Sequence, residues 1–146
     1  MNEPFTPLEQ DSWGGLLWAH SRMMGFIESD LQEKFQISHP EFEVLLRLGW
    51  AQDHRARIQD LAADSVLTRS GVSRLVDRLE KAGYVTKEVA PEDRRGAYAV
   101  LSLQGQEHFE RALKAHVKIV NSYFLQHFSE LELTQMAEFW KRIPRS

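Results

Sequence analysis

The sequence predicts a mainly helical chain with one small β-hairpin: a winged helix-turn-helix lobe plus further helices at both chain ends. The main observation is the stretch 67–103, where an amphipathic helix, a glycine and two short strand-like runs follow one another. The second is a short helical segment before it, at the spacing of a helix-turn-helix. The third is the apolar surface of the long terminal helices, which exceeds what a winged helix of ordinary size needs.

Composition restricts the class of protein. A chain of 146 residues fits one domain, or a small domain extended by helices that need a partner, and its apolar fraction of 42% supports a folded core. No stretch is apolar for long enough to span a bilayer, and the N-terminus lacks a signal pattern, so we expect a cytoplasmic protein. The absence of cysteine excludes disulfides, thiolate zinc sites and thiol redox sensing.

The charge distribution is uneven. The net charge of -3 by itself argues against a nucleic-acid binder. Residues 55–95, however, hold nine of the eighteen Lys and Arg residues against seven acids, a net +2, and the rest of the chain carries nine against fourteen, a net -5. Basic groups therefore concentrate in the predicted winged lobe. Because the excess is small, tight DNA binding would need favourable geometry and two copies of the site.

The N-terminal part predicts a loose lead-in over residues 1–8 and then a long helix from about Glu9. Its apolar positions recur every three or four residues. They are Trp13, Leu16, Leu17, His20, Met24, Ile27 and Leu31. A second helix should begin at Ser38, with Ser38 as its N-cap, Glu41 reaching back to close a capping box, and Ile37 and Phe42 as a hydrophobic staple.

Residues 53–57 form a polar break, which we expect to separate the second helix from a short helix at 58–63 and a connector at 64–67. The next helix should begin after Thr68 as N-cap and end at Gly83. Its apolar side carries Val72, Leu75, Val76 and Leu79, and its polar side carries Arg69, Ser70, Ser73, Arg74, Asp77 and Lys81. Strands over 84–89 and 97–103, joined by a turn at 91–96, should form the wing.

The C-terminal part predicts two more helices. One begins at Ser102 and carries an apolar stripe, and Ser129 with Glu132 forms a capping box that starts the last helix. The stripe is Phe109, Leu113, His116, Val117, Val120 and Phe124. We therefore predict a winged lobe at 38–102, and dimerisation helices at 1–37 and 103–146. A homodimer would cover their apolar surface economically, although a monomeric core is the alternative.

Several of these segments together resemble the MarR family of bacterial transcription regulators. The resemblance rests on Leu61-Ala62, the run 73–85 (SRLVDRLEKAGYV), Asp93-Arg94-Arg95-Gly96 and the run 101–105 (LSLQG). It covers about residues 57–105. It implies a homodimer on a pseudo-palindromic operator, repression, and release by a small, often aromatic, ligand that binds between the dimer helices and the DNA-binding lobe.

The first half of the polar helix holds the side chains expected to reach bases: Arg69, Ser70, Ser73 and Arg74. Arginine can contact guanine through two hydrogen bonds, and serine can contact bases or phosphates. For Arg74 the alternative is an ion pair on a solvated face. Arg78 lies at the edge of this face, and either DNA or Asp93 can be its partner.

The resemblance also assigns the wing. It makes Asp93 and Gly96 structural residues, places Arg95 in the minor groove, where a narrow groove concentrates negative potential, and leaves Arg94 for a phosphate. Arg55 and Arg57 fit either phosphate contacts or a solvated turn.

An effector site is predicted on the helical stripes. His20 and His116 fit either a satisfied core or interface, or a pocket in which imidazole binds a phenol or carboxylate. The apolar walls would be Trp13, Trp18, Met23, Met24 and Phe42. The spacing of His108 and His116 does not make a compact metal-ligand pair, so we expect neither a metal nor a cofactor.

Two functions from different classes are compatible with the sequence. The first is a ligand-responsive DNA-binding repressor. The alternative is a winged-helix protein-protein interaction module without operator binding, which the mild acidity would fit and which Arg69, Arg74 and Arg95 argue against. An enzyme has no support, because the sequence shows no nucleophile-base set and no phosphate-binding loop.

Overall fold

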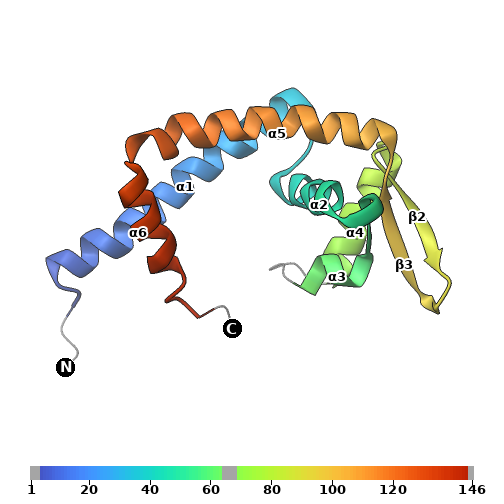
Figure 1. Ribbon diagram of the computed structural model, residues 1–146, viewed down its shortest axis with the longest axis horizontal. Helices are drawn as coiled ribbons and strands as arrows, with labels where there is room; N and C mark the ends of the chain where they lie inside the picture. The colour runs from blue at the N-terminus through green and yellow to red at the C-terminus, as the bar shows by residue number, and fades with distance from the viewer. Residues whose placement is uncertain (1–3, 64–68, 145–146) are drawn as a thin grey trace. The chain divides into compact units, whose positions relative to one another are not determined.

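A computed structural model of the chain describes residues 4–63 and 69–144, apart from the side chains of Arg69, Arg94 and Arg95. The chain divides into two compact units, residues 1–27 with 116–146, and residues 28–115. The boundaries fall inside the two longest helices, α1 (Pro7–Phe35) and α5 (Leu103–Tyr123) (Figure 1). The functional division predicted at residues 37 and 103 stays a prediction. Within the described ranges, no helix is both long and apolar enough to cross a membrane.

Helix α1 begins earlier than the sequence predicted, because its first turn is capped. The backbone N–H of Thr6 donates to Oε2 of Glu9 at 2.7 Å, and the N–H of Glu9 donates to Oγ1 of Thr6 at 3.2 Å. Pro7 occupies the first helical position, where its missing N–H costs no hydrogen bond. The predicted lead-in over residues 1–8 is therefore too long at its C-terminal end.

The rest of the first unit follows the predicted order. After α5 come a short 3₁₀ turn, η2 (Leu125–His127), and α6 (Glu130–Trp140). The predicted capping box is confirmed: the N–H of Ser129 donates to Oε2 of Glu132 at 2.8 Å, and the N–H of Glu132 donates to Oγ of Ser129 at 3.2 Å. These two bonds satisfy N–H groups that the helix itself leaves open.

The second unit begins with α2 (His39–Trp50). Ser38 caps it as predicted, because its Oγ accepts from the N–H of Glu41 at 3.2 Å. The return bond of a capping box is not formed. The Glu41 carboxylate instead lies 3.3 Å from Nε of Arg78, on helix α4 (Arg69–Lys81). Phe42, the predicted staple residue, is buried in the core of this unit.

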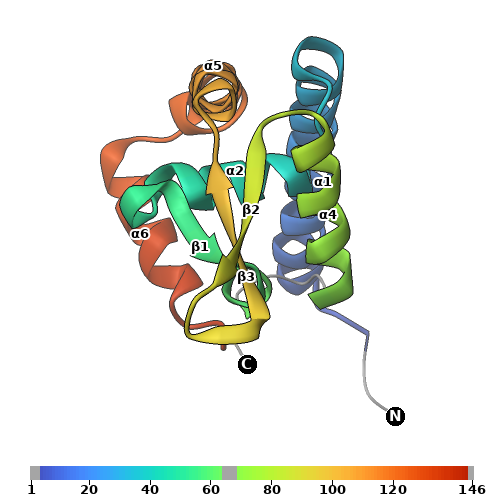
Figure 2. The ribbon, with the colours of Figure 1, turned by 90° about the vertical axis from the view of Figure 1, so that its right-hand side faces the viewer.

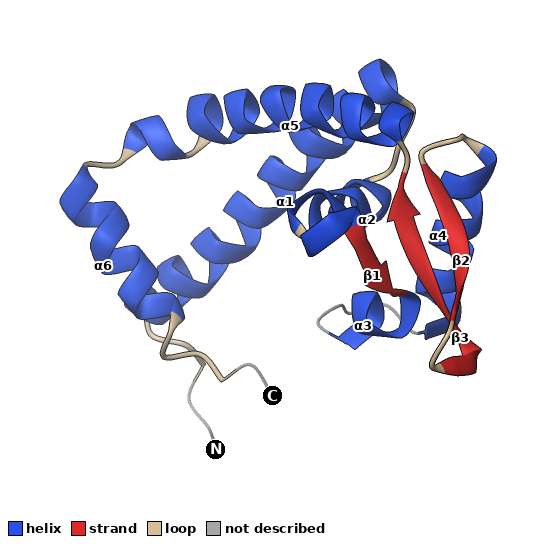
Figure 3. Ribbon diagram, turned by 45° about the vertical axis from the view of Figure 1, so that its right-hand side comes forward, coloured by secondary structure: helices blue, strands red, loops and turns tan. Residues whose placement is uncertain are grey.

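A three-stranded antiparallel sheet forms the wing, in the order β1-β3-β2 (Figures 2 and 3). Its strands are β1 (Arg55–Arg57), β2 (Val85–Ala90) and β3 (Asp93–Leu101). Strand β1 lies in the segment predicted as a polar break and follows a 3₁₀ turn, η1 (Gln52–His54). A run of three residues is too short to show strand alternation, so only the pairing with β3 reveals it.

The wing tip is shorter than predicted. Strand β3 begins at Asp93, so only Pro91 and Glu92 remain in the turn, and the register shifts between Val89 and Ala90. Val89 pairs with Ala97, whereas Ala90 pairs with Asp93, so residues 94–96 of β3 lie between these two partners. The predicted turn over 91–96 therefore included four residues that belong to the sheet.

Helices α3 (Ile58–Ala63) and α4 (Arg69–Lys81) form the helical part of the winged lobe. The short helix agrees with the prediction, whereas Thr68 and the connector 64–67 lie outside the described residues. The predicted apolar side of α4 is buried: Val72, Leu75, Val76 and Leu79 are each at most 4% exposed. Helix α4 stops before Gly83, whose φ is +84°, as predicted.

Helix α5 enters the core of the second unit through close contacts. The Ser102 hydroxyl donates to the Gly83 carbonyl at 2.6 Å and accepts from the Gly105 N–H at 2.9 Å, which joins the end of the α4 turn to the start of α5. A Cβ at Gly105 would lie 2.0 Å from the Tyr84 carbonyl oxygen, so glycine is required for this approach. These contacts position β2, and with it the wing.

Candidate nucleic-acid interface and aromatic pocket

The polar side of α4 carries the predicted base-contacting residues. Arg74 and Ser70 are exposed and Ser73 is half-buried, while the opposite side of the helix is buried in the core. The backbone of Arg69 begins the helix, and its side chain lies outside the described part. An exposed polar face on a helix anchored by four apolar side chains can enter a DNA groove without disturbing the lobe.

Arg78 has a partner that neither predicted alternative named. Its Nε lies 3.3 Å from the Glu41 carboxylate, whereas Asp93 pairs with Arg57, so the alternative of an Arg78–Asp93 pair is wrong. A DNA contact by Arg78 stays a prediction. The pair ties the end of α4 to the first turn of α2. The Arg78 side chain is still 61% exposed, which leaves most of its guanidinium in contact with solvent.

Asp93 binds Arg57, which lies on the strand that the sequence did not predict. Nη2 of Arg57 donates to Oδ2 of Asp93 at 3.2 Å. The same guanidinium explains why position 96 is a glycine, because a Cβ there would lie 2.6 Å from Nη2 of Arg57. Glycine therefore leaves room for the guanidinium between β1 and the first residues of β3, which supports the structural roles predicted for Asp93 and Gly96.

The neighbouring Arg55 contacts the wing in a different way. Its guanidinium lies 4.1 Å from the centre of the Tyr98 ring and 3.5 Å from the Glu88 carboxylate. The Tyr98 hydroxyl donates to Oε1 of Glu92 at 2.5 Å. This hydrogen bond lowers the pKa of Glu92 and raises the pKa of Tyr98. The Arg55 guanidinium thus contacts side chains of the sheet, Glu88 on β2 and Tyr98 on β3.

Strand β2 is fastened to α4 by its lysine. The Lys87 ammonium pairs with the Asp77 carboxylate, and the Lys87 backbone N–H donates to Oε2 of Glu80 at 3.1 Å. Asp77, which the helical period places on the polar side of α4, therefore faces the wing. These contacts join α4 to the wing.

A polar depression of about 380 Å³ lies where β1, α3, α4 and β3 meet. Its lining is Arg57, Ile58, Gln59, Ser70, Ser73, Gly96 and Ala97. Two of the predicted DNA-contacting residues, Ser70 and Ser73, are thus brought together with Gln59, which was not predicted as a contact, and with Arg57, for which a phosphate contact was one of two alternatives. The sequence did not reveal that these residues share one site, because a run of three residues is too short for β1 to be recognised.

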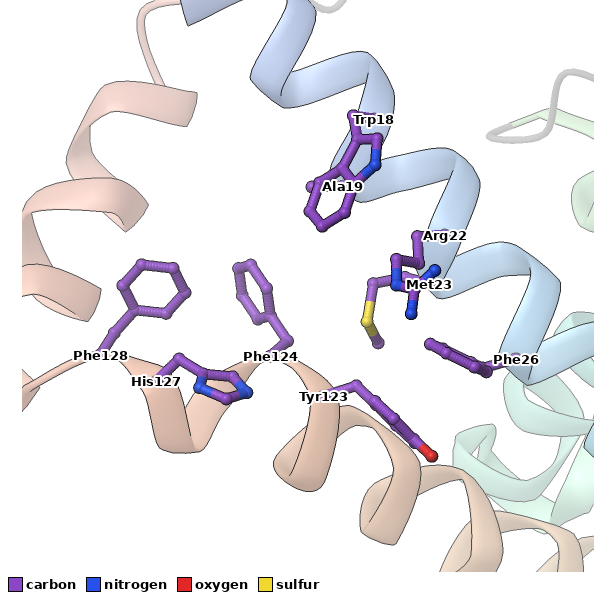
Figure 4. A pocket seen from close by; sticks show the side chains of 9 residues that line it. All are labelled: Trp18, Ala19, Arg22, Met23, Phe26, Tyr123, Phe124, His127 and Phe128. Atoms are coloured by element: carbon purple, nitrogen blue, oxygen red, sulfur yellow. The ribbon is translucent and has the colours of Figure 1, made fainter.

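An aromatic pocket of about 390 Å³ lies in the first unit, between α1 and the end of α5 (Figure 4). Its lining is Trp18, Ala19, Arg22, Met23, Phe26, Tyr123, Phe124, His127 and Phe128. The Arg22 guanidinium lies 5.2 Å from the centre of the Phe26 ring and 5.8 Å from the Trp18 ring. Phe26 stacks on Tyr123 at 4.1 Å. One cation among flat aromatic faces suits a planar anion.

The predicted pocket residues are dispersed. Trp18 lines the aromatic pocket, and His20 lines an adjacent groove of about 410 Å³ on α1, α5 and α6. Met23 lines both, whereas Trp13, Met24 and His116 line neither. Phe42 is 1% exposed and lies in the core of the second unit, with its ring 6.3 Å from that of Phe109.

Arg22, Tyr123 and His127 line the aromatic pocket but were not among the predicted pocket residues. A signal existed for the first, because Trp18, Arg22 and Phe26 follow one another at intervals of four, which places them on one side of a helix. The contribution of Tyr123 and His127 depends on how α5 and the turn after it pack on α1, which no local pattern shows.

Comparison with known proteins gives a consistent result. Residues 37–96 match the model of the MarR family. A transcriptional regulator of Bacillus cereus is 25% identical over 142 residues, which cover 93% of this chain and 92% of that protein. The crystal structure of AbsC, a MarR family regulator from Streptomyces coelicolor, is 29% identical with a TM-score of 0.90 and covers 96% of this chain and 94% of its own.

The structure of a second relative was determined in complex with DNA. Sco3205, a MarR family regulator from Streptomyces coelicolor in complex with DNA, is 28% identical with a TM-score of 0.90, over 97% of this chain and 88% of its own. The likeness includes the α4 helix and the wing described above and extends over nearly the whole chain. We conclude that the chain belongs to the MarR family of winged helix-turn-helix DNA-binding transcription regulators and is not an enzyme.

Proposed function

We propose that the chain is a homodimeric repressor in the bacterial cytoplasm, bound to a pseudo-palindromic operator and released by a small aromatic ligand. The observation that carries this proposal is the exposed polar face of α4, held beside the wing by the Lys87–Asp77 ion pair. A rigid helix-and-wing pair presents one element to the major groove and one to the adjacent minor groove. Two such pairs in a homodimer would read two half-sites.

The DNA contacts follow from this placement. The side chains that would read base edges are Arg69, Ser70, Ser73 and Arg74. Arg78, at the end of the helix, would contact the DNA backbone. By the family pattern, Arg95 would enter the minor groove and Arg94 would contact a phosphate. The complex of Sco3205 with DNA supports a DNA ligand for this fold. The repressor YetL of Bacillus subtilis, 28% identical over 66% of this chain and 57% of its own, supports repression.

Homodimer formation is supported by the composition of the first unit. Among the buried hydrophobic residues of the described chain, only Ile27 lies within residues 1–27 and 116–146. Large apolar side chains of this unit are instead exposed: Trp13, Trp18, Leu131, Phe139 and Trp140 each expose about half of their surface or more. Exposed apolar area of this kind marks an association surface, and a second copy of the same helices is its economical cover.

The aromatic pocket supports a ligand. Trp18, Phe26 and Tyr123 provide flat apolar faces, and Arg22 provides the charge for a carboxylate. BpsR of Bordetella bronchiseptica shares the fold, with 18% identity and a TM-score of 0.79, and its DNA binding is regulated by 6-hydroxynicotinic acid. We therefore propose an aromatic carboxylate as the effector class for this chain.

The first experiment is footprinting of the purified protein on the DNA upstream of its own gene, across a salt series. We expect protection of a pseudo-palindrome with half-sites about one helical turn apart, and a steep loss of affinity as salt rises, because bound phosphates release counterions. Absence of protection at low salt, there and in a selection from genomic fragments, would favour the interaction-module alternative.

The effector proposal has its own measurement. Aromatic carboxylates are titrated against the protein-operator complex, and Trp fluorescence reports their binding. In Arg22→Ala, the ligand should be less able to release the protein from the operator, while the affinity for the operator without ligand stays unchanged. Lys114→Ala, on the exposed side of α5, is the matched control that should behave as the parent. Equal ligand response of the parent and Arg22→Ala would contradict this pocket as the effector site.

A further inference from the structure

We propose that the polar depression between β1, α3, α4 and β3 binds one phosphate of the DNA backbone, and that Arg57 is its main ligand. This proposal rests on the proposed function and names a contact within it. The site differs from the wing arginines, and it adjoins the base-reading side of α4, with which it shares Ser70 and Ser73. Its lining residues come from segments separated by up to forty positions in sequence, so only the folded lobe assembles it.

The position of the depression follows from the shape of a duplex. When a helix lies in the major groove and a wing in the adjacent minor groove, one DNA strand must pass between them, because that strand separates the two grooves. Ser70 and Ser73 mark the α4 side of the depression, and Gly96 and Ala97 mark the wing side. A phosphate of the intervening strand therefore comes to this place.

The lining chemistry suits an anion. The guanidinium of Arg57, the side-chain amide of Gln59 and the hydroxyls of Ser70 and Ser73 can all donate hydrogen bonds, and among the described residues of the lining none is acidic. Ser70 lies in the first turn of α4, where the helix dipole also favours negative charge. Arginine and serine are common phosphate contacts in protein–DNA complexes.

Asp93 orients the guanidinium. It holds Nη2 of Arg57 at 3.2 Å, and the Asp93 side chain is itself 45% exposed, so the pair is well solvated. A guanidinium has five N–H donors, and one ion pair leaves others for a phosphate. Gly96 preserves this arrangement, because a Cβ there would lie 2.6 Å from Nη2 and would displace it. The nearby Glu92 carboxylate accepts a hydrogen bond from the Tyr98 hydroxyl.

The test is the salt dependence of binding to two duplexes, the footprinted operator and an unrelated duplex of the same length. A phosphate contact is independent of sequence, so its loss should change both alike. Arg57→Ala should reduce the slope of log K against log salt by about 0.9 for each subunit bound. Arg57→Lys keeps the positive charge and should restore most of the slope.

Two further variants separate this role from wing support. Asp93→Asn removes the ion pair but keeps Arg57, so it should retain the parental salt slope even where affinity falls. Arg55→Ala removes an arginine of the same strand that pairs with Glu88 and stacks on Tyr98, and it should also retain the slope. Circular dichroism confirms that each variant is folded.

The outcomes are distinct. An unchanged slope in Arg57→Ala, with parental binding intact, overturns the phosphate site and leaves the proposed function standing. Equal loss of slope in Arg57→Ala and Arg55→Ala also overturns it, because it shows a general charge effect. If the parent binds neither duplex at low salt, the proposed function and the phosphate site fail together.

Discussion

Nε2 of the buried His108 donates a hydrogen bond to the Phe35 carbonyl oxygen at 2.9 Å, across 73 residues of sequence. Its ring also stacks on Tyr84, with centroids 4.2 Å apart, and Nδ1 lies 3.4 Å from Nη2 of Arg111. Because a carbonyl can only accept, Nε2 carries the proton, and Nδ1 is left to accept from the arginine. The neutral imidazole thus joins the end of α1, the start of the wing and α5.

This environment predicts acid sensitivity of the second unit. Burial lowers the pKa of His108, the Phe35 hydrogen bond opposes that effect, and the Arg111 charge adds to it. With a folded pKa below the unfolded value of about 6.5, the unfolded state binds more protons between the two values. Stability is therefore fully present above about pH 6.5 and falls as pH decreases toward the folded pKa.

Urea unfolding at a series of pH values between 8 and 5 would measure this effect, with His108→Gln as the comparison. We expect the free energy of unfolding of the parent to fall more steeply with acidification than that of His108→Gln. The variant retains a donor for the Phe35 carbonyl but does not titrate. Parallel pH profiles would show that another group is responsible.

Arg95→Ala should weaken operator binding while leaving the dimer and its helix content intact. The physical reason is the loss of a cation from the wing, which the family pattern places in the minor groove. Anisotropy titration measures the affinity, and sedimentation with circular dichroism checks the dimer and the fold. If operator affinity equals that of the parent, the assignment of Arg95 to the minor groove is wrong.

Arg74→Ala should relax base preference at one position per half-site. The Arg74 side chain is exposed on the polar side of α4, so we expect it to form a paired hydrogen bond with a base, and its loss should cost about 1–3 kcal/mol at that position. Competition with operators mutated base by base measures the change. An equal loss on every sequence would identify Arg74 as a phosphate contact instead.

Gly105→Ala should destabilise the second unit by about 1–3 kcal/mol, because the added methyl group would lie 2.0 Å from the Tyr84 backbone carbonyl. That atom cannot move without shifting the start of β2. Thermal unfolding measures the effect, and Glu107→Ala, an exposed position on the same helix, serves as control. Parental stability of Gly105→Ala would mean that α5 packs less closely on the wing than the structure shows.

Much of the architecture was predictable because it depends on local interactions. The cap of Ser38, the capping box of Ser129 and the glycine at position 83 each act within a few residues of themselves. The period of α4 likewise separates its buried side from its polar side within one helix. The short strand β1 was missed, because a strand of three residues is defined by its pairing with Val100, Ala99 and Tyr98.

The candidate site was predictable in part. Sequence and family resemblance named the α4 side chains and the wing, but they did not suggest Glu41 as the partner of Arg78, and they built the aromatic pocket from residues that are dispersed. Arg22 could have been found from its helical spacing with Trp18 and Phe26. The pairing of Arg57 with Asp93 could not, because the two residues lie 36 positions apart and Arg57 is on a strand that only its pairing in the sheet defines.

The sequence by itself determined where α2 and α6 begin, where the turn after α4 lies and which side of α4 is buried, because caps, glycines and helical periods act over three or four residues. Only the tertiary structure decided that Arg57 binds Asp93, that Arg78 binds Glu41 and that His108 binds the Phe35 carbonyl. Each of these side chains has several chemically equivalent partners in the sequence. The packing of helices on the sheet selects one of them by bringing it within hydrogen-bond distance.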